Sequence, residues 1–242
     1  MSQSQFVSEL TLSHGGAEAA SVPASQAAYD ALRRRIITLD LPPGAVISRS
    51  EEAEQMGVSQ TPIREALQKL EQDGLVRIVP QSRTTVRRID VKQLHETHFL
   101  RVAVESEVVR QLAQGGHKDN LRRARAVLHM QGALVGDTDQ MDMFDALDRS
   151  FHLTLFEALG MGRLHAMLAR QLGHLSRCQR LDLQRDGKMA DIIAAHTAII
   201  DGIDAGDHDA AVAAMRAHLS GTIRRVPDLQ DEFPDYFTTG AD

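Results

Sequence analysis

Four polar side chains in the second half of the chain have the types and spacing of a metal site. They are one carboxylate and three imidazoles: Asp148, His152, His196 and His218. Neutral imidazoles together with one carboxylate suit Zn²⁺, Ni²⁺, Mn²⁺ or a similar divalent ion. Such a set leaves coordination positions open for water or for an acidic ligand.

The surroundings of these residues predict that they face a core. Asp148 and His152 are four residues apart, so they share one helix face beside an apolar stripe. His196 and His218 each lie within a stripe of aliphatic residues. An unpaired buried polar group costs roughly 1–3 kcal/mol, and one shared ion would satisfy all four groups. Taken singly, each histidine could instead be a core residue bonded to a backbone carbonyl.

A second polar pair, Arg101 and Glu105, lies on the buried stripe of an earlier predicted helix. The Arg101 guanidinium could pair with a ligand carboxylate. The alternative is an ion pair with Glu105, four residues away on the same helix. We expect His165 and His174 to be surface or structural residues.

The elements that must position these groups are helices. Beyond residue 90 the sequence gives no strand signal, and amphipathic periods predict helices over about 92–114, 118–135, 138–159, 162–184, 188–205 and 207–225. We therefore expect an all-α bundle over residues 91–226, followed by a C-terminal tail over 227–242. The first 24 residues are rich in Ser, Ala and Gly and predict a flexible arm.

Residues 25–90 have the pattern of a winged helix-turn-helix. A first helix ends at Leu41-Pro42-Pro43-Gly44, a capping box at Ser48 and Glu51 begins a short second helix, and a third runs to about Asp73. Residues 75–79 and 84–86 predict a hairpin with its turn at 80–82. The overall fold class is thus mainly α, with a small winged domain before the bundle.

The third helix of this domain predicts a DNA-reading surface. Its polar residues face away from Ile63 and Leu67, and they are Ser59, Gln60, Thr61, Arg64 and Gln68. Arginine can present its fork to guanine or phosphate, and glutamine can pair with adenine. On an isolated helix such residues would be only solvated. Arg83, at the wing, could reach the minor groove or a phosphate, or could be solvated.

Charge and composition set limits on these predictions. The chain has a net charge of −6, but residues 26–90 carry ten Lys/Arg and nine Asp/Glu, a net charge of +1. DNA binding must therefore depend on local placement of basic side chains. A single cysteine, Cys178, excludes an intrachain disulfide. No signal peptide or apolar span is recognisable, so we expect a cytoplasmic protein without membrane contact.

Two stretches resemble a known family. The segments LPPGAVIS and EEAEQMGVSQTPIREALQKLEQDGLV, followed by a wing, resemble the DNA-binding head of GntR regulators. The resemblance implies that the third helix enters the major groove by its N-terminal end. Gln60 stands where the family usually has Arg, Ser50 lies near a usual basic position, and Arg83 appears where Gly is common. Base preference is therefore expected to differ from that of typical members.

The second half resembles the FCD type of effector domain. The resemblance is carried by Arg101-Val-Ala-Val-Glu105, Asp148-Arg-Ser-Phe-His152, Ala195-His196 and Ala217-His218-Leu219. It implies that the four residues bind a metal, as the equivalent residues do in many members. Met161 departs from the pattern, since Asn is common at this position. The shape of the cavity is therefore expected to differ from that of typical members.

The combined prediction is a homodimeric transcription regulator, of the repressor type. It would bind a pseudo-palindromic operator in double-stranded DNA, and a small organic acid at the metal site would control its affinity. One alternative is a metal-dependent hydrolytic enzyme that uses the same Asp/His site to activate water. Another is an architectural DNA-binding protein without a ligand, which the buried polar groups disfavour.

Overall fold

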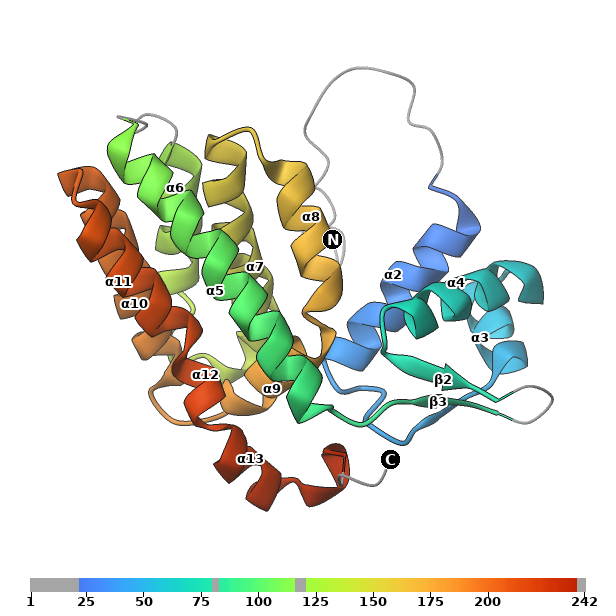
Figure 1. Cartoon of the computed structure of the whole chain (residues 1–242). Coiled ribbons are helices and arrows are strands. Elements are labelled where there is room, and N and C mark those ends of the chain that lie inside the picture. The colour runs from blue at the N-terminus through green and yellow to red at the C-terminus, as the bar shows by residue number, and fades with distance from the viewer. Residues whose placement is uncertain (1–21, 80–82, 116–120, 239–242) are drawn as a thin grey trace.

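The computed structural model describes residues 22–79, 83–115 and 121–238. Most of the expected arm and the predicted turn at 80–82 lie outside these residues. The fold is mainly helical, as predicted. Figure 1 shows a winged head on one side and a larger helical bundle on the other. Among the described residues, no helix is both long and apolar enough to cross a bilayer.

Within its described residues, the head has three helices and a three-stranded sheet. In chain order these are α2 (Ala24–Ile37), β1 (Val46–Ile47), α3 (Arg49–Met56), α4 (Gln60–Gln72), β2 (Val76–Ile78) and β3 (Thr84–Val86). The antiparallel strands run in the order β1-β3-β2, with Val46 opposite Thr85 and Val76 opposite Val86. Leu32, Ile36, Ile63 and Leu67 form part of one buried core.

The bundle follows with helices of very different length. They are α5 (Val91–Gln114), α6 (Arg122–Gly132), η2 (Thr138–Gln140), α7 (Met141–Ala158), α8 (Gly162–Gln171), α9 (Gly173–Asp182), α10 (Lys188–Ala205), α11 (His208–Leu219), α12 (Gly221–Arg224), α13 (Val226–Glu232) and η3 (Pro234–Tyr236). Asp90 and Asp207 cap α5 and α11, because their carboxylates accept hydrogen bonds from backbone N–H groups of the first turn.

Helices α10 and α11 approach each other closely at Gly202. A Cβ atom at this position would lie 2.7 Å from the backbone nitrogen of Ala211, which is too short for any other residue without a shift. This close contact holds together the two helices that carry His196 and His218. The arrangement of α10 and α11 beside α5 is visible at the left of Figure 1.

The structure corrects several expected boundaries. The predicted helix 162–184 is two helices, because the chain bends at Leu172, where Gly173 packs against Leu75 of the head. The predicted helix 207–225 is interrupted at Ser220. A third strand, β1, was not predicted, because two residues are too few to show alternation. The last residue of the expected bundle and the first part of the expected tail form α13, Val226–Glu232.

Helix α9 joins the bundle to the head through two buried polar residues. The Asp90 backbone N–H donates to His174 Nδ1 at 3.0 Å, and Arg177 Nη1 donates to the Arg87 carbonyl at 2.5 Å. Arg177 Nη2 also lies 3.0 Å from His174 Nδ1. Burial lowers the pKa of His174 to about 3, so its ring is neutral and its Nδ1 accepts.

The C-terminal segment reinforces the same junction. Ile89, in the linker between head and bundle, donates its backbone N–H to the Tyr236 carbonyl at 2.7 Å. Thr238 donates back to the Ile89 carbonyl at 3.0 Å. Phe237 and Ile89 are both buried in a core shared with α9 and α13. The end of the chain therefore fixes the point at which the head leaves the bundle.

Burial of His174 predicts a specific pH dependence of stability. Its folded-state pKa of about 3 lies below the ordinary 6.5, so below pH 6.5 only the unfolded chain takes up the proton. The contribution of this residue to the free energy of unfolding is present above pH 6.5 and falls by about 1.4 kcal/mol per pH unit as the pH drops. Asparagine can also accept from Asp90 but does not titrate.

We expect His174→Asn to be less stable than the wild type at pH 7, and the gap to shrink by about 2 kcal/mol at pH 5. Urea unfolding at both pH values measures this difference. A gap that stays constant between pH 7 and pH 5 would contradict the assignment of a buried neutral ring.

Candidate functional site

The four residues of the predicted metal site come together in the bundle. Asp148 and His152 lie on α7, His196 on α10 and His218 on α11. One ligand atom from each residue can be chosen so that all four atoms lie within 4.8 Å of one another. Two of the histidines are almost completely buried, with exposed fractions of 3% for His152 and 0% for His196.

The chemistry of this cluster fits a cation. His152 Nε2 lies 3.1 Å from His218 Nε2, and His196 Nε2 lies 3.5 Å from Asp148 Oδ1. Buried Nε2 of His196 and Oδ1 of Asp148 have no hydrogen-bond partner among the described residues. Unpaired ring nitrogens and a carboxylate that face a common centre are the donor set that a divalent ion requires.

His152 is oriented by a buried carboxylate behind it. Its Nδ1 lies 2.6 Å from Glu105 Oε2, and Arg101 Nε donates to Glu105 Oε1 at 2.5 Å. The structure thus places Arg101 in the ion pair that was one of its two predicted alternatives. A carboxylate that binds Nδ1–H leaves Nε2 as the lone-pair nitrogen toward the cluster.

His196 is oriented in the same manner by an amide. Its Nδ1 lies 3.0 Å from Gln131 Oε1, while Gln131 Nε2 donates to the Phe144 carbonyl at 3.3 Å. The second contact settles which amide atom faces the ring. The His196 ring also stacks on Phe151 with a centroid distance of 3.9 Å. These contacts direct Nε2 of His196 toward Asp148.

Burial controls the charges of the cluster. Burial lowers the pKa of His196 and of His218 well below 6.5, and neighbouring imidazoles lower both further, so both rings are neutral. Burial alone would raise the pKa of the Glu105 carboxyl, but Arg101 and His152 hold that pKa below its usual range. Neutral rings are the forms that bind metal ions.

Two cavities meet at the cluster. The larger, about 460 Å³, is lined by Asp148 and His218 together with residues of α9, α10 and α12. The smaller, about 260 Å³, is lined by Asp148, His152 and the pair Arg101 and Glu105 on one side, and by residues of α2 on the other. The cluster is therefore open to a ligand and adjoins the head.

Gln131 was missed by the sequence reasoning. It lies on the buried face of α6 with Ala124 and Val127. The signal that could have found it is its spacing from these two residues, which places a glutamine on their apolar stripe. Other polar residues of the larger cavity, among them Gln179 and Lys188, carried no such signal.

The predicted DNA-reading residues lie on one exposed surface of the head. Gln60, Thr61, Arg64 and Gln68 are exposed on α4, and Ser59 is its N-cap. The side chain of Arg64 makes no hydrogen bond or ion pair with another described residue. Ile63 and Leu67 fix the opposite face in the core. Arg83 is exposed at the start of the segment that leads into β3.

Comparison with known protein families matches both halves of the chain. The model of the bacterial regulatory proteins of the gntR family matches residues 24–86, and the FCD domain model matches residues 96–221. The FCD match alone covers more than half of the 242 residues. The chain belongs to the GntR family of transcription regulators. Its C-terminal domain is of the FCD type.

Individual relatives agree with this membership. The chain is 36% identical over 220 residues to an uncharacterized HTH-type transcriptional regulator in an unstable DNA locus of Streptomyces ambofaciens, covering 88% of this chain and 89% of the relative. It is 27% identical over 216 residues to the HTH-type transcriptional repressor RspR of Escherichia coli, covering 89% and 94%. These relatives are regulators and not enzymes.

Solved structures share the fold. E. coli McbR/YncC superimposes with a TM-score of 0.72 at 19% identity, covering 88% of this chain and 99% of that one. A putative GntR regulator from Rhodococcus sp. RHA1 gives a TM-score of 0.70 at 22% identity, covering 86% and 99%. This GntR regulator thus binds DNA through its winged head and carries an FCD domain with a candidate metal site.

Glu105 and Gln131 are predicted to tune metal affinity without touching the ion. We expect Glu105→Gln to weaken zinc binding by about 10- to 100-fold, because a neutral amide holds the His152 ring less firmly. Gln131→Leu should act in the same direction by leaving His196 Nδ1–H unpaired. Competition with a chromophoric chelator measures both affinities.

The control for these variants is Glu107→Gln, the same change on an exposed residue of the same helix. It should leave zinc affinity unchanged. Far-UV circular dichroism checks that the variants are folded. If Glu105→Gln and Gln131→Leu both bind zinc as tightly as the wild type, the assigned supporting roles are wrong.

Proposed function

We propose that this regulator is a repressor whose affinity for its operator is controlled by a small organic acid bound at a metal ion in the FCD domain. The observation that carries the proposal is the cluster of Asp148, His152, His196 and His218, of which Asp148 and His218 line a ligand-sized cavity. Cavities of roughly 300–1,000 Å³ are typical of small-molecule sites.

The four residues would hold a divalent ion, with zinc, nickel and manganese as candidates. When bound, such an ion would act as a Lewis acid that attracts the carboxylate oxygens of the acid. Glu105 and Gln131 keep the rings of His152 and His196 in the required tautomers. Arg101 neutralises Glu105 and also lines the smaller cavity, where it could meet a ligand carboxylate.

Helix α9 supports a physical connection between the site and the DNA-binding head. Gln179 on this helix lines both cavities, and His174 and Arg177 on the same helix hold the linker to the head. Gln179 and His174 are five residues apart, about 7.5 Å along the helix axis. A ligand that shifts α9 would therefore change the orientation of the head, and the operator affinity would change with it.

Operator binding is proposed to use two heads. A single winged head reads a short half-site, so a pseudo-palindromic operator requires a two-fold symmetric pair. We expect the bundle to form the interface of this homodimer. Light scattering of the full-length protein at micromolar concentration should give twice the mass of the chain, and a monomeric mass would contradict this part of the proposal.

The main experiment measures the affinity of the protein for an operator fragment by fluorescence anisotropy. The fragment is first selected from genomic DNA by its binding to the protein. Arg64→Ala should lose specific binding by about 10-fold or more, since a good base contact is worth roughly 1–3 kcal/mol. It should keep its metal content. His196→Ala should still bind the fragment but should lose its metal. Organic acids that dissociate the wild-type protein from the fragment should have no effect on this variant.

A His196→Ala protein that keeps its full metal content and is still released from the operator by organic acids would contradict the proposed site. If Arg64→Ala binds the operator as tightly as the wild type, the assignment of α4 as the helix that contacts the bases is wrong. The alternative of a metal-dependent hydrolase is not favoured, because the relatives are regulators. Metal-dependent turnover of small esters or amides by the purified protein would revive it.

A further inference from the structure

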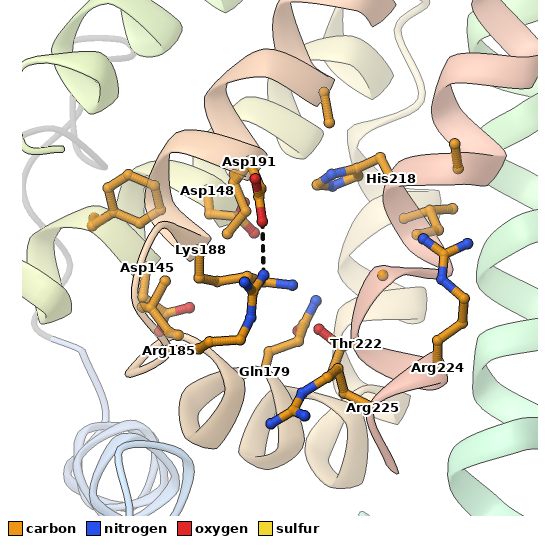
Figure 2. Close-up of a pocket in the computed structure, with 17 residues that line it drawn as sticks. Asp145, Asp148, Gln179, Arg185, Lys188, Asp191, His218, Thr222, Arg224 and Arg225 are labelled. Atoms are coloured by element: carbon orange, nitrogen blue, oxygen red, sulfur yellow. Dashed lines mark hydrogen bonds and ion pairs between the residues drawn. The ribbon is translucent and has the colours of Figure 1, made fainter. Parts of the chain in front are cut away.

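The larger cavity has a polar end away from the metal cluster. Asp148 and His218 face each other across its upper part in Figure 2, while Gln179, Lys188 and Arg185 reach toward its middle from below. Thr222, Arg224 and Arg225 line the remaining wall. This end consists of residues that neither the metal site nor the DNA-binding surface uses.

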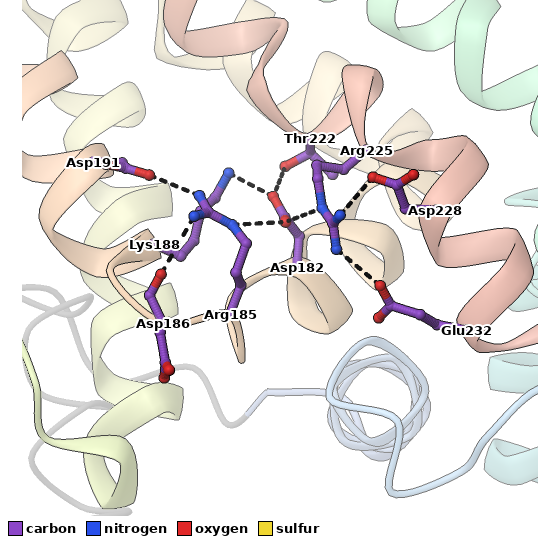
Figure 3. A network of polar contacts seen from close by, with 9 residues as sticks. All are labelled: Asp182, Arg185, Asp186, Lys188, Asp191, Thr222, Arg225, Asp228 and Glu232. Atoms are coloured by element: carbon purple, nitrogen blue, oxygen red, sulfur yellow. Dashed lines mark hydrogen bonds and ion pairs between the residues drawn. The ribbon is translucent and has the colours of Figure 1, made fainter.

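A completely buried carboxylate, Asp182, organises the cations at this end. Figure 3 shows Lys188, Arg185 and Arg225 around it, with Thr222 donating a hydrogen bond at 3.1 Å. Lys188 Nζ lies 2.5 Å from Asp182 Oδ2, while the Nε atoms of Arg185 and Arg225 lie 3.8 and 3.6 Å from Oδ1. One carboxylate therefore faces three cations.

Lys188 has hydrogen-bonding capacity that Asp182 does not use. Its side chain is only 11% exposed, and Asp182 is its one ion-pair partner among the described residues. An ammonium group has three N–H donors, so further donors remain for a ligand in the cavity. The exposed acids Asp191, Asp228 and Glu232 pair instead with Arg185 and Arg225.

Two other polar side chains on the wall have no partner among the described residues. The Arg224 guanidinium makes no ion pair, and the Gln179 amide makes no side-chain hydrogen bond. Arg224 is exposed and Thr222 is buried, and both line this cavity from α12. An arginine fork matches the two oxygens of a carboxylate.

One cation of the wall, Arg224, has no carboxylate partner among the described residues, whereas Lys188, Arg185 and Arg225 share Asp182 and the exposed acids. Four cationic residues line the cavity against three acids, namely Asp145, Asp148 and Asp191. Asp145 is paired with Arg149 outside the wall, Asp191 with Arg185, and Asp148 belongs to the metal cluster. A divalent ion at the cluster would add positive charge at the other end of the cavity, which attracts anions.

We propose that this cavity selects small dicarboxylates, with one carboxylate at the metal end and the second at Lys188 and Arg224. This inference rests on the proposed function, because the first carboxylate needs the metal site. A monocarboxylate of the same length would leave the donors of Arg224 and Gln179 unused. The volume of about 460 Å³ equals that of roughly fifteen liquid waters, which is room for an acid with two charged ends.

The test compares pairs of acids of equal length on the full-length, zinc-loaded protein. Isothermal titration calorimetry measures butanedioate against butanoate, pentanedioate against pentanoate and hexanedioate against hexanoate. We expect at least one dicarboxylate to bind about tenfold or more tightly than its partner, an advantage of about 1.4 kcal/mol. Arg224→Gln should remove most of this advantage and change monocarboxylate affinity less than twofold.

The matched control is Arg216→Gln, the same loss of charge at an exposed arginine of α11 outside the cavity wall. It should leave both affinities unchanged, and elemental analysis should give equal zinc content in all variants. The dicarboxylate subsite would be overturned by equal affinities within every pair, or by an equal loss of affinity for both acids in Arg224→Gln. Either outcome would leave the proposal of an acid bound at the metal intact. Binding of none of the six acids to the zinc-loaded protein would overturn both proposals.

Discussion

The requirement that buried polar atoms have partners governs the centre of this protein. Three imidazoles and a carboxylate meet where α7, α10 and α11 pack, and two of the rings are inaccessible to water. Leaving such groups unpaired costs more than most single contacts contribute to stability. Glu105 and Gln131 contact the outer ring nitrogens of His152 and His196, which turns their Nε2 atoms toward His218 and Asp148. The contacts of Glu105 and Gln131 therefore orient the rings for a cation, and these contacts are present without the cation.

Sequence periodicity was sufficient for the residues that share a helix or a stripe. Asp148 and His152 could be paired from their spacing of four, and the apolar stripes around His196 and His218 predicted that both rings face the core. The exposed polar face of α4 followed from the opposite positions of Ile63 and Leu67. In each case the information is local, because the helical repeat alone decides which side chains point together.

The parts that sequence could not supply depend on contacts between distant segments. The bend at Leu172 has no proline, and the glycine after it, Gly173, can also lie within a continuous helix; the bend reflects the contact of Gly173 with Leu75 of the head. The pairing of Tyr236 and Thr238 with Ile89 joins residues about 150 positions apart by backbone hydrogen bonds, which side-chain patterns do not encode. The Asp182 cluster likewise draws its cations from α10, the preceding loop and the segment after α12.

Helix α9 is where these constraints come together. Its first turns carry His174 and Arg177, which are buried against the linker, and its last residue is the buried Asp182 beside the cavity. Both ends of this ten-residue helix are therefore held by polar contacts that are costly to break, and the residues between them cannot change register independently. A rigid helix fixed at a ligand cavity and at a domain junction moves as a unit. In the proposed mechanism, the same buried contacts that stabilise the junction would carry a movement of α9 from the cavity to the head.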